Sequence, residues 1–157
     1  MDSTITIREY ELEDIKEMAE LGEMMHKEGA YSFLPYSKSK CRELGKKFKN
    51  WDYGNMWVAE SDGKIVGMYI AVITEYYFCY EKLAQDMLLY VHPDHRKGTI
   101  AIRLVKKAEE WAKERGARQF MSATSLTRSP EQISKLKKFF NFMKYETVGN
   151  IFKKRLD

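Results

Sequence analysis

The sequence predicts a mixed α/β (α+β) fold in which helices cover the faces of one sheet. Three observations carry this prediction. Apolar residues recur with a period of two in some segments and of 3.6 in others, in the order β-α-α-β-β-β-α-β-α-β. A strong hairpin turn at Asp62-Gly63 joins two apolar runs, and a later strand, helix and strand form a β-α-β crossover.

The first third of the chain predicts one strand and two helices. Residues 4–10 alternate β-branched apolar and polar side chains, as in a strand with one buried face. Apolar residues then recur at helical spacing from Leu12 to Gly29, a residue type that commonly ends helices. After an aromatic-rich loop, residues 39–50 predict a shorter, basic helix.

The middle of the chain carries the clearest β signal. Residues 55–80 form the predicted hairpin, and residues 83–93 predict a further strand. The apolar spacing then becomes helical from Ala101 onward, and Gly116 closes this helix.

The last part of the chain predicts a strand, a helix and a terminal β segment. Residues 118–126 predict the strand, and Ser129 followed by Pro130 announces the helix as N-cap and first helical residue. Residues 145–156 predict one or two strands around Gly149.

The composition indicates a single globular domain that spans residues 1–157. Apolar residues make up 44% of the chain, which is too many for a disordered protein. A net charge of +4 would help to attract an anionic ligand but falls short of a dedicated nucleic-acid binder. The two cysteines form no C-x-x-C pair and the histidines are not clustered, so neither a disulfide framework nor a metal site is indicated.

The N-terminal stretch "MDSTITIREYELEDIKEM" has neither an apolar signal core nor a basic leader, and no run of 18 apolar residues follows it. We therefore expect a cytoplasmic protein that is not secreted and does not span a membrane.

A basic turn, "VHPDHRKGTIAIRL", lies between a predicted strand and the next helix. A pyrophosphate needs several converging N–H donors, and the first N–H groups of a helix have no intrahelical partner. Gly98 and Ala101 are small enough for close approach, while Arg96 and Lys97 can add charge-assisted contacts. Thr99 either offers its hydroxyl or crowds the ligand with its β-branch. An ordinary exposed basic loop is the alternative interpretation.

This turn resembles the cofactor-binding motif of the GNAT family of acetyl-CoA-dependent N-acetyltransferases, and the element order is similar over nearly the whole chain. Val91, Pro93, Arg96 and Ala101 match the family pattern, whereas Thr99 stands where a glycine is usual. The resemblance implies acetyl-CoA as co-substrate and a mostly antiparallel central sheet with one parallel, splayed pair of strands and helices on both faces. It implies pyrophosphate contacts from Arg96, Lys97, Gly98, Thr99, Ile100 and Ala101.

The resemblance also implies how the rest of the co-substrate binds. In this family pantetheine enters between the splayed strands and hydrogen-bonds like an added strand. By position, the main chain of Leu89, Tyr90 and Val91 would make these bonds.

The family tends to take its general base from a polar side chain on the same strand. Gln85 and Asp86 occupy that region, and Tyr90 is a third candidate. Strand alternation points Gln85 and Asp86 to opposite faces, so only one of them faces the cleft unless a bulge intervenes. Asp86 is the better base chemically, although a solvent-facing carboxylate fits the pattern equally well.

The resemblance also implies a position for the general acid, because many members of the family use a tyrosine on the last helix. The stretch "FFNFMKYETVG" places Phe140 at that position, and a phenylalanine cannot transfer a proton. A free thiol has a pKa of about 8.5, so a thiolate leaves tolerably well without help. Another group or water acts as the acid, or the protein binds acetyl-CoA without fast turnover.

Three functional hypotheses follow. The first is an N-acetyltransferase in which the primary amine of a small molecule or protein attacks acetyl-CoA directly in a ternary complex. The second is a catalytically idle acyl-CoA-binding or interaction module. The third is a nucleic-acid-associated protein, suggested by "KKFKNW" and "FKKRL", although a solvated face accounts for these stretches better. The aromatic content is compatible with a homodimer, and Tyr31, Tyr76 and Tyr77 are candidates for the acceptor side.

Overall fold

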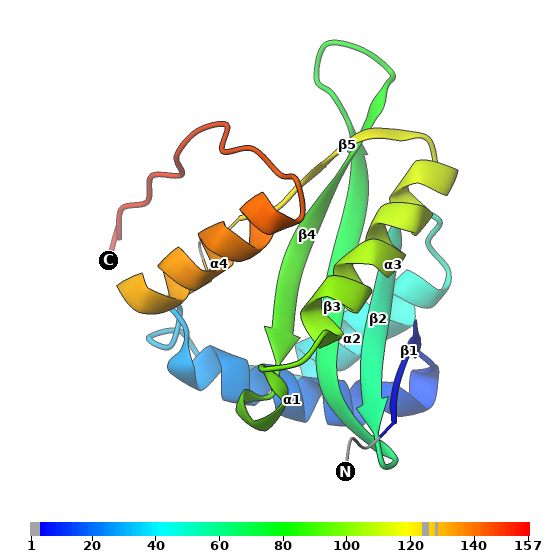
Figure 1. Ribbon diagram of the computed structural model, residues 1–157, viewed down its shortest axis with the longest axis vertical. Helices are drawn as coiled ribbons and strands as arrows, with labels where there is room; N and C mark the ends of the chain where they lie inside the picture. Colours follow the sequence, from blue (N-terminus) through cyan, green and yellow to red (C-terminus); the bar gives the residue numbers. More distant parts are fainter. Residues whose placement is uncertain (1–3, 124–125, 128) are drawn as a thin grey trace.

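One mixed sheet organises the protein. The computed structural model describes residues 4–123, 126–127 and 129–157, and in this part of the chain five strands lie in the order β1-β2-β3-β4-β5 (Figure 1). All neighbours are antiparallel except β4 and β5, which are parallel. The predicted sheet with one parallel pair is therefore confirmed. The strands are β1 (Ile5–Glu9), β2 (Gly54–Ser61), β3 (Lys64–Glu75), β4 (Lys82–Val91) and β5 (Ala117–Met121).

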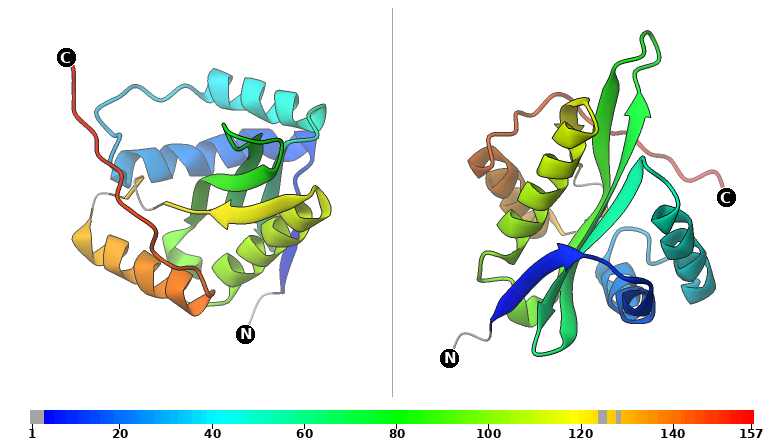
Figure 2. Two further views of the ribbon diagram at one scale, coloured as in Figure 1. Left: turned by 90° about the horizontal axis from the view of Figure 1, so that it is seen from above. Right: turned by 90° about the vertical axis from the view of Figure 1, so that its right-hand side faces the viewer.

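Helices cover both faces of this sheet, as predicted (Figure 2). One face carries α1 (Ile15–Glu28) and α2 (Lys38–Lys49), and the other carries α3 (Ile100–Glu114) and α4 (Pro130–Phe142). Short 3-10 helices precede α1 and α3, at Leu12–Asp14 and Pro93–His95. None of the helices in the described ranges is long and apolar enough to cross a bilayer.

The sheet separates two apolar cores. On the α3 side, Leu104 and Val105 are fully buried, and the ring of Trp111 meets Trp57 edge to face with centroids 5.3 Å apart. On the α1 side, buried residues such as Met18 from α1 pack against the sheet. Side chains of a strand alternate between the two faces, and helices cover both faces of this sheet (Figure 2). Both sets of side chains on the middle strands are therefore buried, and the sequences of these strands are nearly continuous apolar runs.

The predicted turns and helix ends occur where the sequence placed them. Asp62 and Gly63 both have positive φ, 50° and 76°, which is the backbone of a tight two-residue hairpin. Gly116 has φ of 84° directly after the C-cap of α3. At the start of α4, the Ser129 hydroxyl accepts a hydrogen bond from the backbone N–H of Gln132 at 3.4 Å.

The predicted C-terminal strands are wrong, because residues 145–157 form no strand. Alternating apolar residues make a strand only where another strand can pair with them. This segment instead runs past the sheet, with Val148 and Phe152 exposed, and the Lys153 ammonium lies 4.7 Å from the ring centroid of Tyr31. The alternation of apolar residues is present in this segment, but no strand of the described residues pairs with it.

Candidate active site

The parallel pair of strands separates after a short contact. β4 pairs with β5 only from Lys82 to Gln85, and β5 ends at Met121, earlier than the predicted end of this strand. Residues 124 and 125 of that prediction lie outside the described residues. The edge of β4 beyond Gln85 thus has no paired strand on this side within the described ranges, and its backbone groups can accept an extended ligand.

A cavity of about 580 Å³ opens along this unpaired edge. Its walls come from β4, the start of α3, α4 and the end of α1. Most predicted site residues line it: Asp86, Leu89, Tyr90, Val91, Arg96, Lys97, Gly98 and Ala101. Gln85, Thr99 and Ile100 are not part of its lining. The structure therefore brings most of the predicted cofactor residues together, without Thr99 and Ile100, and of the two adjacent polar candidates it brings Asp86 but not Gln85.

The start of α3 has the geometry of an anion cradle. Thr99 is the N-cap without a side-chain hydrogen bond to the helix, and the first helical bond runs from the N–H of Arg103 to its carbonyl at 3.0 Å. The N–H groups of the first turn therefore have no intrahelical partner. A Cβ added at Gly98 would meet nothing within 4 Å, so this backbone faces open space. The Ile100 side chain is buried in the core, which leaves its backbone for a ligand.

Arg96 joins the end of β4 to the end of α1. Its Nε donates to the Val91 carbonyl at 2.8 Å, and its Nη2 donates to Oε1 of Glu28 at 2.8 Å. The guanidinium also lies 5.2 Å from the ring centroid of Tyr90. Burial and the neighbouring Glu28 carboxylate raise the pKa of Tyr90 to about 12, so this phenol stays neutral near pH 7. Arg96 thus holds the turn in place as well as adding positive charge near the cavity.

A β-bulge in β4 decides which side chains face which core. Across β3, Ala71 pairs with Asp86 and Ile70 pairs with Leu88, so Met87 is an extra residue without a partner on β3. Before the bulge, even-numbered residues face α3; after it, odd-numbered residues such as Leu89 do, while Tyr90 faces α1. Asp86 and Tyr90 therefore lie on opposite faces although both line the cavity.

Asp86 is a largely buried carboxyl group with a raised pKa. Burial raises its pKa to about 6, and hydrogen bonds from the Ser122 side chain, the Ala123 backbone and Tyr69 partly oppose this rise. The Tyr69 hydroxyl lies 3.4 Å from Oδ2 of Asp86 and also 3.4 Å from the Ser122 hydroxyl. Tyr69 and Ser122 were not predicted, since nothing in their local sequence separates them from other strand residues. Asp86 is mostly ionised at pH 7.5 yet basic enough to take a proton.

Phe140, which the sequence places at the usual position of the general acid, belongs to the wall of the cavity along β4. Phe140 lines the cavity with a carbon ring and packs against Tyr145, with centroids 5.2 Å apart. The Tyr145 hydroxyl donates to Oε1 of Glu109 at 2.8 Å, and burial followed by this carboxylate raises its pKa well above the usual range. Neither ring supplies a proton donor suited to neutral pH.

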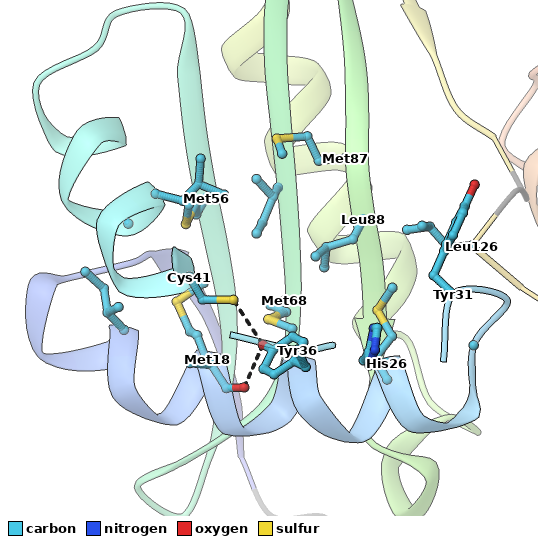
Figure 3. A pocket seen from close by; sticks show the side chains of 18 residues that line it. Met18, His26, Tyr31, Tyr36, Cys41, Met56, Met68, Met87, Leu88 and Leu126 are labelled. Carbon is cyan, nitrogen blue, oxygen red and sulfur yellow. Dashed lines mark hydrogen bonds between the residues drawn. The ribbon is translucent and has the colours of Figure 1, made fainter. Parts of the chain in front are cut away.

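A second cavity, of about 240 Å³, lies on the face of the sheet that carries α1 and α2, between these helices and strands β3 and β4 (Figure 3). Tyr31 lines it, as one of the predicted acceptor-side tyrosines, whereas Tyr77 is 99% exposed. The two cavities meet at β4, because Met87 and Leu88 belong to the walls of both.

The sheet with its separated parallel pair, and the helix start beside it, define the fold of the N-acetyltransferases. An aminoglycoside N-acetyltransferase, AAC(6')-Iy in complex with CoA, has a TM-score of 0.80 at 18% identity and covers 99% of this chain and 96% of its own. A glucosamine-6-phosphate N-acetyltransferase from Arabidopsis thaliana has a TM-score of 0.76 at 18% identity, with 98% and 99% covered. A ribosomal-protein-alanine N-acetyltransferase from Brucella melitensis biovar Abortus 2308 has 0.72 at 21%, with 98% and 100% covered.

The chain belongs to the acetyltransferase (GNAT) family, whose model matches residues 22–133, more than half of the sequence. The protein is therefore an acyltransferase with acetyl-CoA as its co-substrate. No curated protein sequence matched the chain.

Gly98→Ala tests the cradle. Because the added methyl group meets open space, the thermal midpoint without ligand should stay the same or rise slightly. CoA affinity, measured by calorimetry, should fall at least about tenfold because the methyl group occupies the space that a phosphate needs to reach the N–H groups. Unchanged CoA affinity would show that the phosphates do not approach this turn.

Asp86→Asn tests the burial of the carboxylate by its effect on stability. The folded-state pKa of about 6 lies above the unfolded value of about 3.9. The contribution of Asp86 to stability is therefore greatest below pH 4 and is lost as pH rises through 6. The variant should exceed the wild type by about 3 kcal/mol in unfolding free energy at pH 7.5, and the gap should close below pH 4. A denaturant titration at both pH values measures this; a gap that does not depend on pH would contradict it.

Proposed function

We propose that this protein transfers the acetyl group of acetyl-CoA to a primary amine, by direct attack in a ternary complex. The observation that carries the proposal is the meeting of two cavities at Met87, next to Asp86. One cavity has a cradle for phosphates, and the other leads to the same point from the opposite face of the sheet. Two substrates bound in them would meet at the bulge without a covalent enzyme intermediate.

The residues of the larger cavity fit acetyl-CoA. The free helix N–H groups and the open space at Gly98 suit its pyrophosphate, with Arg96 and Lys97 adding positive charge. The unpaired edge of β4 at Leu89, Tyr90 and Val91 suits the amide groups of pantetheine, in line with the resemblance seen in the sequence. The remaining residues of the predicted cradle, Thr99 and Ile100, would contribute through the backbone of the helix start.

The co-substrate supplies an activated thioester. A primary ammonium first loses one proton to water. When the resulting neutral amine nitrogen attacks the thioester carbonyl carbon, a C–N bond forms, the C–S bond breaks, the thiolate leaves and the nitrogen loses one further proton. We assign that proton to the Asp86 carboxylate, directly or through one water. Met87 is unpaired with β3, so N–H groups at the bulge are suited to stabilise the developing oxyanion.

Asp86 is preferred to the other two candidate bases. Gln85 lies outside both cavity walls, and its amide has no useful basicity. Tyr90 has a pKa of about 12, too high for a base near neutral pH. Of the three candidates, only Asp86 has a pKa of about 6, lines the larger cavity and directly precedes the bulge residue Met87.

The thiolate leaves without a protein acid in this proposal. A thiol pKa of about 8.5 makes the thiolate a competent leaving group, and the cavity wall holds Phe140 where a phenol would be needed. The carbon ring is also the reason to keep an idle acyl-CoA-binding module as the second candidate.

The nucleic-acid hypothesis has less support. In the stretch "KKFKNW", Phe48 is 4% exposed and packs in the core, so its ring offers no stacking surface. The Lys49 ammonium donates to the Tyr10 carbonyl at 2.6 Å. A homodimer stays a proposal, which the exposed apolar side chains of the C-terminal segment and of residues 77–80 support.

Asp86→Asn should lower kcat at least about a hundredfold, the usual contribution of a positioned general base. With the wild type, kcat/KM should rise with pH through a step near pH 6, because the carboxylate must be ionised; the variant should lack that step. CoA release followed with a thiol reagent between pH 5 and 8 measures both. Asp52→Asn, at an exposed carboxylate that lines neither cavity, is the matched control and should behave as the wild type.

Phe140→Tyr should change kcat by less than about threefold, because departure of the thiolate does not need a proton donor. The same CoA-release assay measures this, with CoA affinity as the check that the cavity is intact. A rise of tenfold or more would mean that the missing acid limits turnover. No release from the wild type with any amine, together with tight CoA binding, would favour the idle module.

A further inference from the structure

The walls of the smaller cavity are unusually rich in methionine. Five of them, Met18, Met25, Met56, Met68 and Met87, come from α1, β2, β3 and β4 and surround the cavity together with leucine and isoleucine side chains (Figure 3). Methionine is flexible and polarisable, and it adapts to apolar groups of different shape. This lining favours an apolar ligand.

Three of the polar side chains in the wall already have hydrogen-bond partners, those of Tyr36, Cys41 and His26. The Tyr36 hydroxyl donates to the Ala19 carbonyl at 2.8 Å, and the Cys41 thiol donates to the Tyr36 oxygen at 3.2 Å (Figure 3). Nε2 of His26 lies 2.7 Å from the Leu34 carbonyl, so this nitrogen must be the donor. Three potential hydrogen-bond donors are thus used within the protein, and the cavity presents mainly carbon and sulfur to a ligand.

No charged side chain lines this cavity: its eighteen described lining residues include no Asp, Glu, Lys or Arg. A ligand cation placed here would lose its water without gaining a counter-ion, which is strongly unfavourable. The larger cavity differs, since Glu28 and Asp86 belong to its wall. A polycationic acceptor therefore does not suit the smaller cavity.

The open end of the smaller cavity coincides with the reacting centre proposed above. Met25, Gly29, Leu88 and Leu126 line both cavities, as does Met87 at the bulge. A molecule whose apolar part fills the smaller cavity would present a terminal amine toward Met87 and the adjacent carboxylate. The amine then lies beside Asp86, and the rest of the molecule contacts lining residues that include no Asp, Glu, Lys or Arg.

We propose that the acceptor is a primary amine carried on a single uncharged apolar group, such as an alkyl chain or one aromatic ring. The inference rests on the proposed function and specifies its substrate class. An apolar cavity of about 150 Å³ holds one benzene ring, so 240 Å³ accommodates a ring with a short arm or an alkyl chain of similar volume.

The test uses the wild-type protein with acetyl-CoA and a series of n-alkylamines from ethylamine to hexylamine. Because each buried methylene adds a constant transfer free energy, kcat/KM should rise about fourfold per methylene. At the same chain length, 1,6-diaminohexane should be at least about a hundredfold poorer than hexylamine, because its second ammonium would be buried without a partner. A flat alkyl series, or a diamine as good as hexylamine, would overturn the inference.

A matched pair of variants tests the location. Met25 lines the cavity, whereas Met24, its neighbour on α1, is exposed and lines neither cavity. Met25→Glu should reduce kcat/KM for hexylamine at least about tenfold and narrow or reverse the preference over the diamine, since a carboxylate now pairs with the second ammonium. Met24→Glu should leave both values unchanged. Equal effects of the two variants would place the acceptor elsewhere.

CoA affinity and the thermal midpoint are measured for both variants, because Met25 also lines the larger cavity. If Met25→Glu does not fold, the wild-type amine series decides alone. Calorimetric binding of hexylamine to the CoA complex distinguishes a failure of the proposed function from a failure of the proposed substrate class. Binding of hexylamine but not the diamine, without turnover, would refute the proposed function and support the apolar cavity. Turnover with the same kcat/KM at every alkyl chain length would support the proposed function and refute the apolar acceptor.

Discussion

The separation of β4 from β5 after Gln85 is the constraint on which the rest of the site depends. A strand in the interior of a sheet has its backbone groups occupied on both sides, and such a strand could not accept an extended ligand. Because pairing with β5 stops at Gln85, the C-terminal part of β4 keeps one unpaired edge. The larger cavity follows that edge to the start of α3. The bulge at Met87 lies close to the point of separation and joins this cavity to the one on the opposite face.

Two polar side chains beside this opening have different effects: Arg96 joins segments of the chain, and Asp86 is buried at a cost in stability. Arg96 binds the end of β4 to Glu28 on α1, so the helix, the strand end and the phosphate turn are positioned together. Asp86 is buried with a raised pKa, and the hydrogen bonds from Tyr69 and Ser122 only partly compensate for the lost water. A carboxylate kept under these conditions is typical of a functional group rather than a stabilising one.

Local signals predicted most of the fold and the cofactor side of the site. The Asp62-Gly63 turn depends on two residues that tolerate positive φ, and the helix stop at Gly116 depends on one, so both were visible in the sequence. The turn from Arg96 to Ala101 was visible for a different reason, because strand end, turn and helix start are contiguous in the sequence. The terminal strands were predicted wrongly because alternation of apolar residues says nothing about whether a neighbouring strand is present.

The sequence by itself determined the element order up to the last helix, the turns, the contiguous basic turn and helix start from Arg96 to Ala101, and the phenylalanine at position 140, because each depends on residues that are neighbours in the chain. Only the tertiary structure decided that Asp86 rather than Gln85 reaches the cavity, and that Tyr69 and Ser122 support it. It also decided that the methionines of α1, β2, β3 and β4 form one apolar chamber. These features arise from the β4 bulge and from contacts between distant segments, and strand periodicity carries no record of either.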